Sequence, residues 1–280
     1  MVEIAWIELC GITLSGSGGP DAGLVWEDLT GWWGLPNIRG QQSNIPGGHG
    51  SFARSALYRD SRVITLKGHI VAYDRAAFNE VRDGLVAALS QSIGLMRVAT
   101  DEGIWERNVE IDTLSIDPDH GRTATSFTVD MVSPDPRRYG PVQSVGPVGL
   151  PVHLGGVRLP KRMPWNFGST SGGSRLVISN GGSIPLSPVI TVTGGGFSQL
   201  SVVDITAARQ LILQLPGVTS ADVVLDSATH RVYVGGQEVT RLLSTRQWFE
   251  VPAGETHRFR FEAPGAVGPL MTGSFRIGAW

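Results

Sequence analysis

Hydrophobic and polar residues alternate along most of the chain, as they do in half-buried β-strands. In the segment RVITLKGHIVAY (62–73), Ile64, Leu66 and Ile70 share one parity and polar residues fill much of the other. Such alternation is typical of antiparallel sheets with one buried face. In the first half of the chain it predicts strands over 3–9, 24–33, 62–73, 95–99, 104–116 and 122–132.

One segment has helical periodicity instead. In DRAAFNEVRDGLVAALSQS (74–92), the apolar residues recur at a spacing of three to four: Phe78, Val81, Leu85 and Leu89. Asp74 stands where an N-cap belongs, and Gly94 follows the last turn. The pattern predicts a helix over 75–91. A single helix leaves a sheet edge or face uncovered, and we expect a neighbouring molecule to cover it.

The alternation stops at SPDPRRYGPVQSVGPVG (133–149), which is rich in proline and glycine and predicts a domain boundary. We therefore expect a first domain over 1–140, a linker and connecting segment over 141–174, and a second domain over 175–280. Closely spaced turn signals in the second domain predict a β-sandwich or jelly roll. Its predicted strands are 175–179, 188–193, 198–204, 209–215, 221–226, 230–234, 246–251, 256–262 and 271–277.

Composition narrows the function classes. The chain of 280 residues has a formal net charge of −2, which predicts no bulk attraction to nucleic acids or anionic membranes. Cys10 is the only cysteine, so neither an intrachain disulfide nor a thiol-based zinc site is possible. The sequence has no signal peptide pattern at its start, and no run approaches the roughly 18 apolar residues of a membrane helix.

The segment VVLDSATHRVYVGGQ (223–237) contains the most suggestive candidate chemistry. Asp226 and His230 could form an acid–base pair, and Gly235 and Gly236 could cradle a phosphate. However, strand residues flank both places, and no helix follows the glycines as a phosphate loop requires. We interpret Asp226 as a turn residue and the two glycines as a tight hairpin turn with positive φ angles.

Other candidate sites are equally weak. Glu106, Glu110 and Asp112 share one strand face and could supply a glycosidase-like pair, but a solvated outer face explains them as well. Asp117, Asp119 and His120 lie in one turn without the ligands of a calcium loop. The sequence lacks HExxH, GxSxG and a dinucleotide fingerprint. We therefore predict no catalytic, cofactor-binding or metal-binding residues, and no enzyme.

Two adjacent tryptophans raise a different possibility. Neighbouring residues in a strand point to opposite faces, so at most one of Trp32 and Trp33 can lie in the core. The other is exposed or lies in an interface, where tryptophan is enriched. The irregular segment 34–51, with Leu35 at its base, is suited to reach a neighbouring molecule.

Several motifs resemble those of the distal tail proteins of long-tailed siphophages. SNGGSIPLSPVITVTGGG (179–196) is similar to the start of their C-terminal domain, with matches at Asn180, Gly182, Pro185, Pro188 and Gly194. The later run VVLDSATHRVYVGGQEVTRLL…WFEVPAGETHRFRFEA matches the family order of strands and turns at Asp226, Gly236, Trp248, Pro252, Gly254 and Phe259. Thr256 departs from the asparagine that is common there. The resemblance covers nearly the whole chain.

The resemblance implies a structural protein of the virion tail tip, assembled in the host cytoplasm. An N-terminal β-sandwich-like domain with one helix would form a ring, in this family usually a hexamer, that continues the tail tube. A C-terminal galectin-like, carbohydrate-module-like sandwich would hold tail-tip hub, fibre or receptor-binding proteins, and leaves a host-surface glycan open as a partner. Trp32, Trp33 and Leu35 are then candidate ring-interface residues. Asp226, Gly235, Gly236, Pro252 and Gly254 are structural turn residues.

Two other functions remain open at this stage. A glycan-binding module for host attachment would use exposed aromatic residues on a sandwich face, with Trp248 and Tyr233 as candidates. A hydrolase would require a carboxylate pair that the fold brings together.

Overall fold

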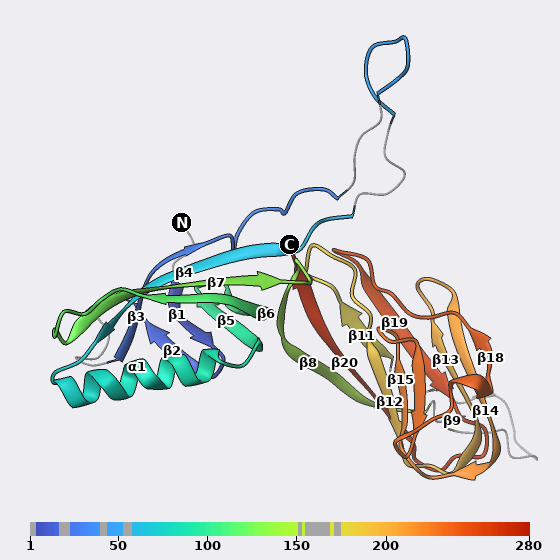
Figure 1. The fold of residues 1–280 in the computed structure, drawn as a ribbon. Coiled ribbons are helices and arrows are strands. Elements are labelled where there is room, and N and C mark those ends of the chain that lie inside the picture. The colour runs from blue at the N-terminus through green and yellow to red at the C-terminus, as the bar shows by residue number, and fades with distance from the viewer. Residues whose placement is uncertain are drawn as a thin grey trace, which may run out of the picture. The chain divides into compact units, whose positions relative to one another are not determined.

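The computed structural model describes residues 4–16, 23–39, 44–52, 58–150, 153–154, 169–170 and 175–280 (Figure 1). The chain divides into two compact units: unit 1 is Met1–Pro141 with Ala279–Trp280, and unit 2 is Val142–Gly278. Both units consist mainly of β-strands, which confirms the predicted mainly β fold class.

Unit 1 is a closed barrel of seven strands. They are β1 (Ile4–Leu9), β2 (Ile12–Ser15), β3 (Gly23–Thr30), β4 (Arg62–Val71), β5 (Ile93–Thr100), β6 (Gly103–Ile116) and β7 (Ala124–Ser133). Their order is β6-β5-β1-β2-β3-β4-β7, and β6 also pairs with β7 to close the sheet. The expectation of an open sheet edge is therefore wrong for the described part of unit 1, because closure removes the edge.

The single predicted helix is present as α1 (Arg75–Leu89). Asp74 is its N-cap, and the Asp74 carboxylate accepts a hydrogen bond from the Ala77 backbone N–H at 2.7 Å. Phe78, Leu85 and Leu89 are buried in the core of unit 1, as their spacing predicts. The helix contacts β4 and β6 and runs beside the barrel strands in Figure 1.

Unit 2 contains two antiparallel sheets with a shared hydrophobic core. One sheet has the order β17-β16-β15-β12-β20-β8 and the other β11-β19-β13-β14-β18. The bounds are β8 (Arg138–Gly149), β11 (Leu176–Ser179), β12 (Val189–Thr193), β13 (Phe197–Asp204), β14 (Arg209–Thr219), β15 (Val223–Asp226), β16 (Arg231–Val234), β17 (Gln237–Glu238), β18 (Leu243–Arg246), β19 (Thr256–Glu262) and β20 (Leu270–Ala279). A 3₁₀ turn (η1, Thr240–Leu242) precedes β18, and β9 (His153–Leu154) pairs with β10 (Ser169–Thr170).

The strand prediction differs from the structure in several places, among them the predicted strand 24–33, which ends at Thr30 of β3. Residues 138–149 form β8, although the proline and glycine content predicted a boundary without a strand. Pairing with β20 outweighs the poor β-propensity of these residues. Strand β2 was not predicted, and the predicted strand 246–251 shares only Arg246 with β18. Most of the expected connecting segment after Leu150 lies outside the described residues, as do residues 17–22.

Candidate interaction surfaces

An extended arm leaves the barrel of unit 1 between β3 and β4. Its described residues are 35–39, 44–52 and 58–61, and Figure 1 shows them as the blue segments above the barrel. Ile38 and Arg59 form an isolated antiparallel bridge, and Asn44 and Ser51 form another. The side chain of Arg59 donates to the Pro36 carbonyl at 2.7 Å. The segment expected to be an irregular connection is thus a hairpin-like projection over its described residues.

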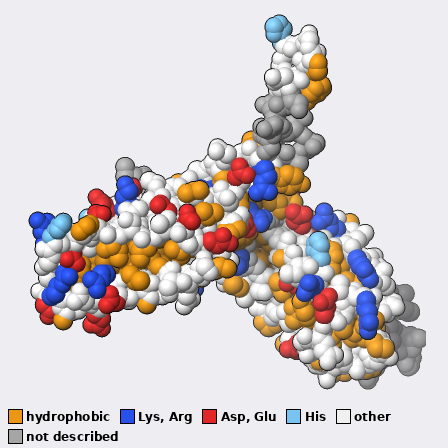
Figure 2. All heavy atoms as spheres, viewed as in Figure 1, with side chains coloured by type: hydrophobic (Ala, Val, Ile, Leu, Met, Phe, Trp, Pro, Cys, Tyr) orange, Lys and Arg blue, Asp and Glu red, His pale blue; other side chains and the backbone are white. Residues whose placement is uncertain are grey.

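Hydrophobic side chains on this arm are exposed. They include Leu35, Ile38, Ile45, Phe52 and Tyr58, and orange side chains are visible on the arm in Figure 2. Apolar surface on a projection without a core of its own is typical of an interaction site.

The base of the arm is held by Arg62, the first residue of β4. Its guanidinium donates hydrogen bonds to the carbonyls of four consecutive residues, Gly31 to Gly34, and to the Pro136 carbonyl, at 2.8–3.3 Å. Gly31 has a φ of +76°, and a Cβ there would overlap the Val63 carbonyl, so only glycine fits this bend. The bend at 31–34 is therefore fixed by a side chain from the neighbouring strand.

This bend separates the two predicted interface tryptophans. The Trp32 side chain is 0% exposed and belongs to the core of unit 1, whereas Trp33 is 37% exposed and Leu35 is 59% exposed. Only one of the two tryptophans is in the core, as expected, but both lie in the bend after β3 (Gly23–Thr30), so the strand alternation assumed for 24–33 is not what separates them. Their role in a ring interface stays a prediction, and only Trp33 and Leu35 offer side-chain surface for it.

Two more arginines stack on tryptophans next to the bend. Arg107 of β6 lies 4.5 Å from the Trp32 ring centroid, and Arg138 of β8 lies 4.7 Å from the centroids of both Trp33 and Trp105. Arg107 is 1% exposed, and burial lowers its pKa to about 9, with repulsion from Arg62 and Arg138 adding to the effect. The pKa of Arg138 is also lowered by burial.

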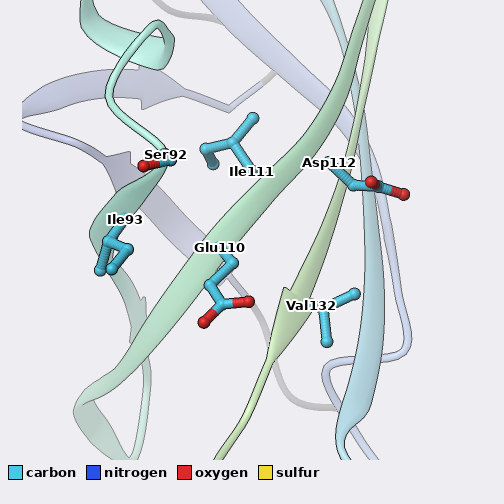
Figure 3. A pocket seen from close by; sticks show the side chains of 6 residues that line it. All are labelled: Ser92, Ile93, Glu110, Ile111, Asp112 and Val132. Carbon is cyan, nitrogen blue, oxygen red and sulfur yellow. The ribbon is translucent and has the colours of Figure 1, made fainter.

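The predicted carboxylate face is split between two places. Glu110 and Asp112 line an open hollow on the barrel together with Ser92, Ile93, Ile111 and Val132 (Figure 3). Glu106 instead pairs with Arg97 at 2.9 Å, and Arg97 also pairs with Glu8 at 3.0 Å. The fold thus uses Glu106 in a cross-strand ion-pair row, and Glu110 and Asp112 stand on an exposed surface.

In unit 2, the candidate chemistry of residues 223–237 is used for turns. The Asp226 carboxylate accepts hydrogen bonds from the backbone N–H groups of Ala228 and Thr229, at 2.9 and 3.2 Å. Gly235 and Gly236 have φ angles of +55° and +83° and connect β16 to β17. The Asp226 carboxylate thus stabilises the turn between β15 and β16, as expected of a turn residue.

His230 does not face Asp226 but stacks on Trp248, with ring centroids 5.0 Å apart and an interplanar angle of 15°. Trp248 is half-buried and packs against the core of unit 2, and Tyr233 is also half-buried. The stacked imidazole covers one face of the aromatic residue that a glycan-binding module would use.

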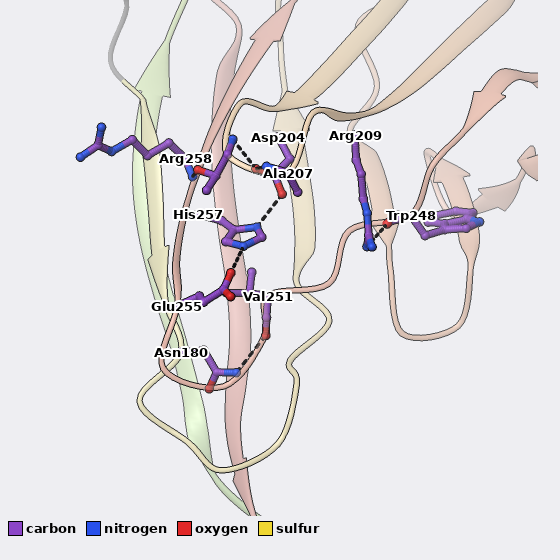
Figure 4. A network of polar contacts seen from close by, with 10 residues as sticks. Asn180, Asp204, Ala207, Arg209, Trp248, Val251, Glu255, His257 and Arg258 are labelled. Carbon is purple, nitrogen blue, oxygen red and sulfur yellow. Dashed lines mark hydrogen bonds and ion pairs between the residues drawn. The ribbon is translucent and has the colours of Figure 1, made fainter. Parts of the chain in front are cut away.

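The motif residue Asn180 fastens the loop before β12 to the turn before β19 (Figure 4). Its buried side-chain amide donates to the carbonyls of Ile184 and Val251, at 2.8 and 2.9 Å, and its carbonyl accepts from the Gly182 N–H at 3.0 Å. The turn itself is closed by a hydrogen bond from the Glu255 N–H to the Pro252 carbonyl, with Gly254 at φ +77°. Asn180 therefore satisfies backbone groups that would otherwise be buried without partners.

A second buried polar cluster in unit 2 was not predicted. His257 Nδ1 lies 2.6 Å from Asp204 Oδ2, and His257 Nε2 lies 3.1 Å from Glu255 Oε2 (Figure 4). The Asp204 carboxylate also accepts from the backbone N–H groups of Thr206 and Ala207. His257 shares the parity of Phe259 and Phe261, both buried, and this parity could have placed it inside.

The same signal could have found the buried arginines. Arg62 shares the parity of Ile64 and Leu66 in β4, and Arg107 that of Val109 in β6. A charged residue on the core face of a strand indicates a specific polar arrangement.

Two further kinds of feature, a metal site and a membrane-spanning helix, are not found among the described residues. Among the described residues, no group of three or more His, Cys, Asp or Glu side chains is placed to hold a metal ion. No helix in the described part of the chain is long and apolar enough to cross a membrane.

Comparisons with known proteins identify the fold. No protein-family model and no curated protein matches the sequence. The crystal structure of the Dit protein of phage SPP1, described as a paradigm of the hub adsorption apparatus in phages that infect Gram-positive bacteria, superposes with a TM-score of 0.66. It is 13% identical, and the match covers 98% of both chains. A chain of the phage p2 baseplate in its activated conformation with Ca matches with a TM-score of 0.52 and 8% identity, over 96% of this chain and 97% of that chain. The fold of both units is therefore that of these phage proteins.

Proposed function

We propose that this chain is a distal tail protein, a structural component of a phage tail tip that joins the tail tube to the tip or baseplate and its receptor-binding proteins. One observation carries the proposal. The fold matches the SPP1 Dit protein over 98% of both chains, so both units and their order along the chain correspond. The sequence motifs point to the same family independently of the fold.

In this proposal, residues 1–140 form a closed ring, which we infer to be sixfold. Because β6 and β7 pair and close the described strands of unit 1 into a barrel, we infer that the subunits join mainly by means other than extending this sheet. Side-chain surfaces and the arm must supply the contacts, and the exposed Trp33 and Leu35 at the arm base support this. Head-to-tail contacts close into a ring when their rotation divides the circle, and a permanent ring contact buries on the order of 2,000 Å² or more.

Residues 175–280 are then a galectin-like domain that holds hub, fibre or receptor-binding proteins. The role is structural, so we assign no catalytic residue and no cofactor. The protein would assemble in the host cytoplasm and reside at the tail tip, with the tail tube protein as the neighbour of the ring.

A mass measurement and an electron micrograph test this function. Native mass spectrometry of the purified chain should give a closed oligomer, for which we expect six copies. Electron microscopy of virions that carry a tagged copy should place the tag at the tail tip. A chain that stays monomeric at high concentration and is absent from tail tips would contradict the proposal.

The glycan-binding alternative gains no support from the described aromatic residues. Sugar binding requires an open aromatic face, and the half-buried Trp248 ring stacks on His230. A binding assay of the chain on a glycan array, with Trp248→Ala as the comparison, would show whether unit 2 has this activity in addition.

A further inference from the structure

A row of side chains crosses four strands on the outer face of the barrel. The strand register places Val63 of β4 beside Val132 of β7, Val132 beside Glu110 of β6, and Glu110 beside Ile93 of β5. Val63 is 63% exposed and Ile93 is 67% exposed, and Val132 is half-buried. Single exposed aliphatic residues are common on protein surfaces, but a contiguous row of them is typical of an interaction site.

The row contains one carboxylate and runs into the open hollow of the barrel. Glu110, Ile93 and Val132 all line this hollow, which has a volume of about 350 Å³ (Figure 3). The Glu110 carboxylate has no hydrogen bond or ion pair among the described residues. Asp112 lies beside the row, where the register of β6 shifts, and is not part of it. The hollow therefore offers aliphatic walls and a free hydrogen-bond acceptor.

The tip of the arm, residues 44–52, carries the complementary groups. A hydrogen bond from the Ile45 N–H to the Gly50 carbonyl, at 3.1 Å, closes the tip into a compact turn. Ile45 is 37% exposed and Phe52 is 57% exposed. His49 is also exposed, and its ring has no hydrogen-bond or ion-pair partner in the described part of the chain. The tip thus presents two apolar side chains and an imidazole donor.

The charge of the arm also fits the hollow. Residues 35–59 contain three arginines and no carboxylate, and Asp60 follows them. Asp60 pairs with Arg39 at 3.1 Å, but both side chains are exposed, so this ion pair contributes little. A positively charged arm is attracted to a surface whose carboxylate is unpaired, and such complementarity favours one docking site over others.

We propose that the arm tip of one copy of the chain binds in the hollow of a second copy. Ile45 and Phe52 pack on the aliphatic row, and His49 donates a hydrogen bond to the Glu110 carboxylate. A second copy is the occupant because the tip and the row are both exposed in a single chain, so they do not cover each other there.

The length of the arm is sufficient for this contact. Residues 35–44, which lead from the barrel to the tip, can span up to about 33 Å when extended, which is about the diameter of a small domain. The proposal rests on the ring proposed above and names the surface that receives the arm.

Disulfide cross-linking between two differently tagged, co-expressed full-length chains tests the contact directly. Both chains carry Cys10→Ser, which removes the only native cysteine. One chain carries Phe52→Cys and the other Ile93→Cys, and oxidation should join the two tagged chains through these positions, as mass spectrometry of the linked peptides would show. Ile104→Cys in place of Ile93→Cys is the matched control, because Ile104 is also exposed but lies towards the far end of the β5–β6 hairpin, where no cross-link should form.

Sedimentation velocity over a range of concentrations measures the effect on subunit association. Glu110→Lys and Phe52→Ala should each raise the subunit dissociation constant about tenfold or more. His49→Glu should also weaken association, and the reciprocal exchange with Glu110→His should restore part of it. Asp101→Lys, at an exposed carboxylate in the β5–β6 turn, is the control and should change little.

The outcomes separate the docking site from the ring itself. Wild-type rings that give no cross-link between positions 52 and 93, and that Glu110→Lys leaves equally stable, would overturn the hollow as the site and leave the ring intact. A monomeric wild type would overturn the ring and the second copy together. A cross-link that forms within one chain carrying both cysteines, and never between the two tagged chains, would place the arm tip on its own barrel and reject the second copy.

Discussion

Asp204 and His257 lie 2.6 Å apart, carboxylate oxygen to ring nitrogen, and both side chains are almost completely buried between the sheets of unit 2. They connect β13 to β19, and Glu255 approaches the other ring nitrogen from the turn before β19. Because the carboxylate of Asp204 also accepts two backbone N–H groups, the pair organises the turn after β13 as well.

His257→Leu should therefore destabilise unit 2 by about 3 kcal/mol, because it leaves the Asp204 carboxylate buried without its partner. Hydrogen exchange measured by mass spectrometry on peptides that cover β13 and β19 would localise the loss of protection. Arg260→Gln, on the exposed face of β19, is the matched control and should change little. Equal protection in His257→Leu and wild type would show that the pair contributes nothing to stability.

The hairpin corner of unit 2 gives a second prediction. Gly235→Val should cost about 2 kcal/mol, because Gly235 has a φ of +55° that a β-branched residue adopts poorly. Gly217→Val in β14 is the control, since Gly217 has open space around its Cβ position and no positive φ. Asp226→Ala should cost less, about 1 kcal/mol, through the loss of its two turn hydrogen bonds. Urea unfolding of the three variants would rank them, and a neutral Gly235→Val would contradict the argument.

The lowered pKa of Asp135, near the end of unit 1, predicts that the folding stability depends on pH. Burial alone would raise the pKa of Asp135, but hydrogen bonds from the Arg137 side chain and backbone and from Tyr139 hold it below its usual value. A carboxyl with a lowered pKa in the folded state stabilises the protein above the ordinary value of 3.8, and that contribution is lost as the pH falls through the folded pKa.

Asp135→Asn should thus lower stability at neutral pH, and the difference from wild type should shrink towards zero in acid. Thermal unfolding of both chains between neutral pH and the acid range below the ordinary aspartate pKa would measure it. Asp112→Asn, on the open hollow of the barrel, is the control substitution at an exposed carboxylate. A deficit in Asp135→Asn that is the same at every pH would point to packing instead of charge.

The sequence predicted those parts of the fold that depend on local periodicity. The helix was found because Phe78, Leu85 and Leu89 share one face and Asp74 caps it. Strand β8 was missed because its Gly146 and Pro147 carry the signals of a loop, and only its pairing with β20, distant in sequence, makes it a strand. The closure of the barrel by β6 and β7 is likewise a long-range property that no local pattern encodes.

The candidate surfaces were predictable only in part. The alternating pattern indicated that at most one of Trp32 and Trp33 is buried, and the structure buries Trp32, although both residues lie in the bend after β3 and not in the predicted strand. The parity of Arg107 with Val109 could have indicated an inward-pointing charge. Its stacking on Trp32 and its proximity to Arg62 and Arg138 join four separate segments, and a pattern within one segment cannot reveal them.

The two neighbouring tryptophans should respond to substitution in opposite ways. Trp32→Ala removes a fully buried indole from the core of unit 1 and should cost about 4 kcal/mol of folding stability. Trp33→Ala removes a half-exposed ring whose described contact is the stack with Arg138, so its folding cost should stay near 1 kcal/mol or below. In the proposed ring, however, Trp33→Ala should weaken subunit association, because it removes apolar interface surface and one of the two tryptophan rings that contact Arg138.

Urea unfolding monitored by circular dichroism would measure the difference in folding stability between Trp32→Ala and Trp33→Ala. Sedimentation velocity of the folded variants would measure the difference in subunit association. Hydrogen exchange in unit 2 should stay unchanged in both variants, as a control for a local effect. If Trp33→Ala destabilised the fold as much as Trp32→Ala and left association unchanged, Trp33 would be a core residue and not part of an interface.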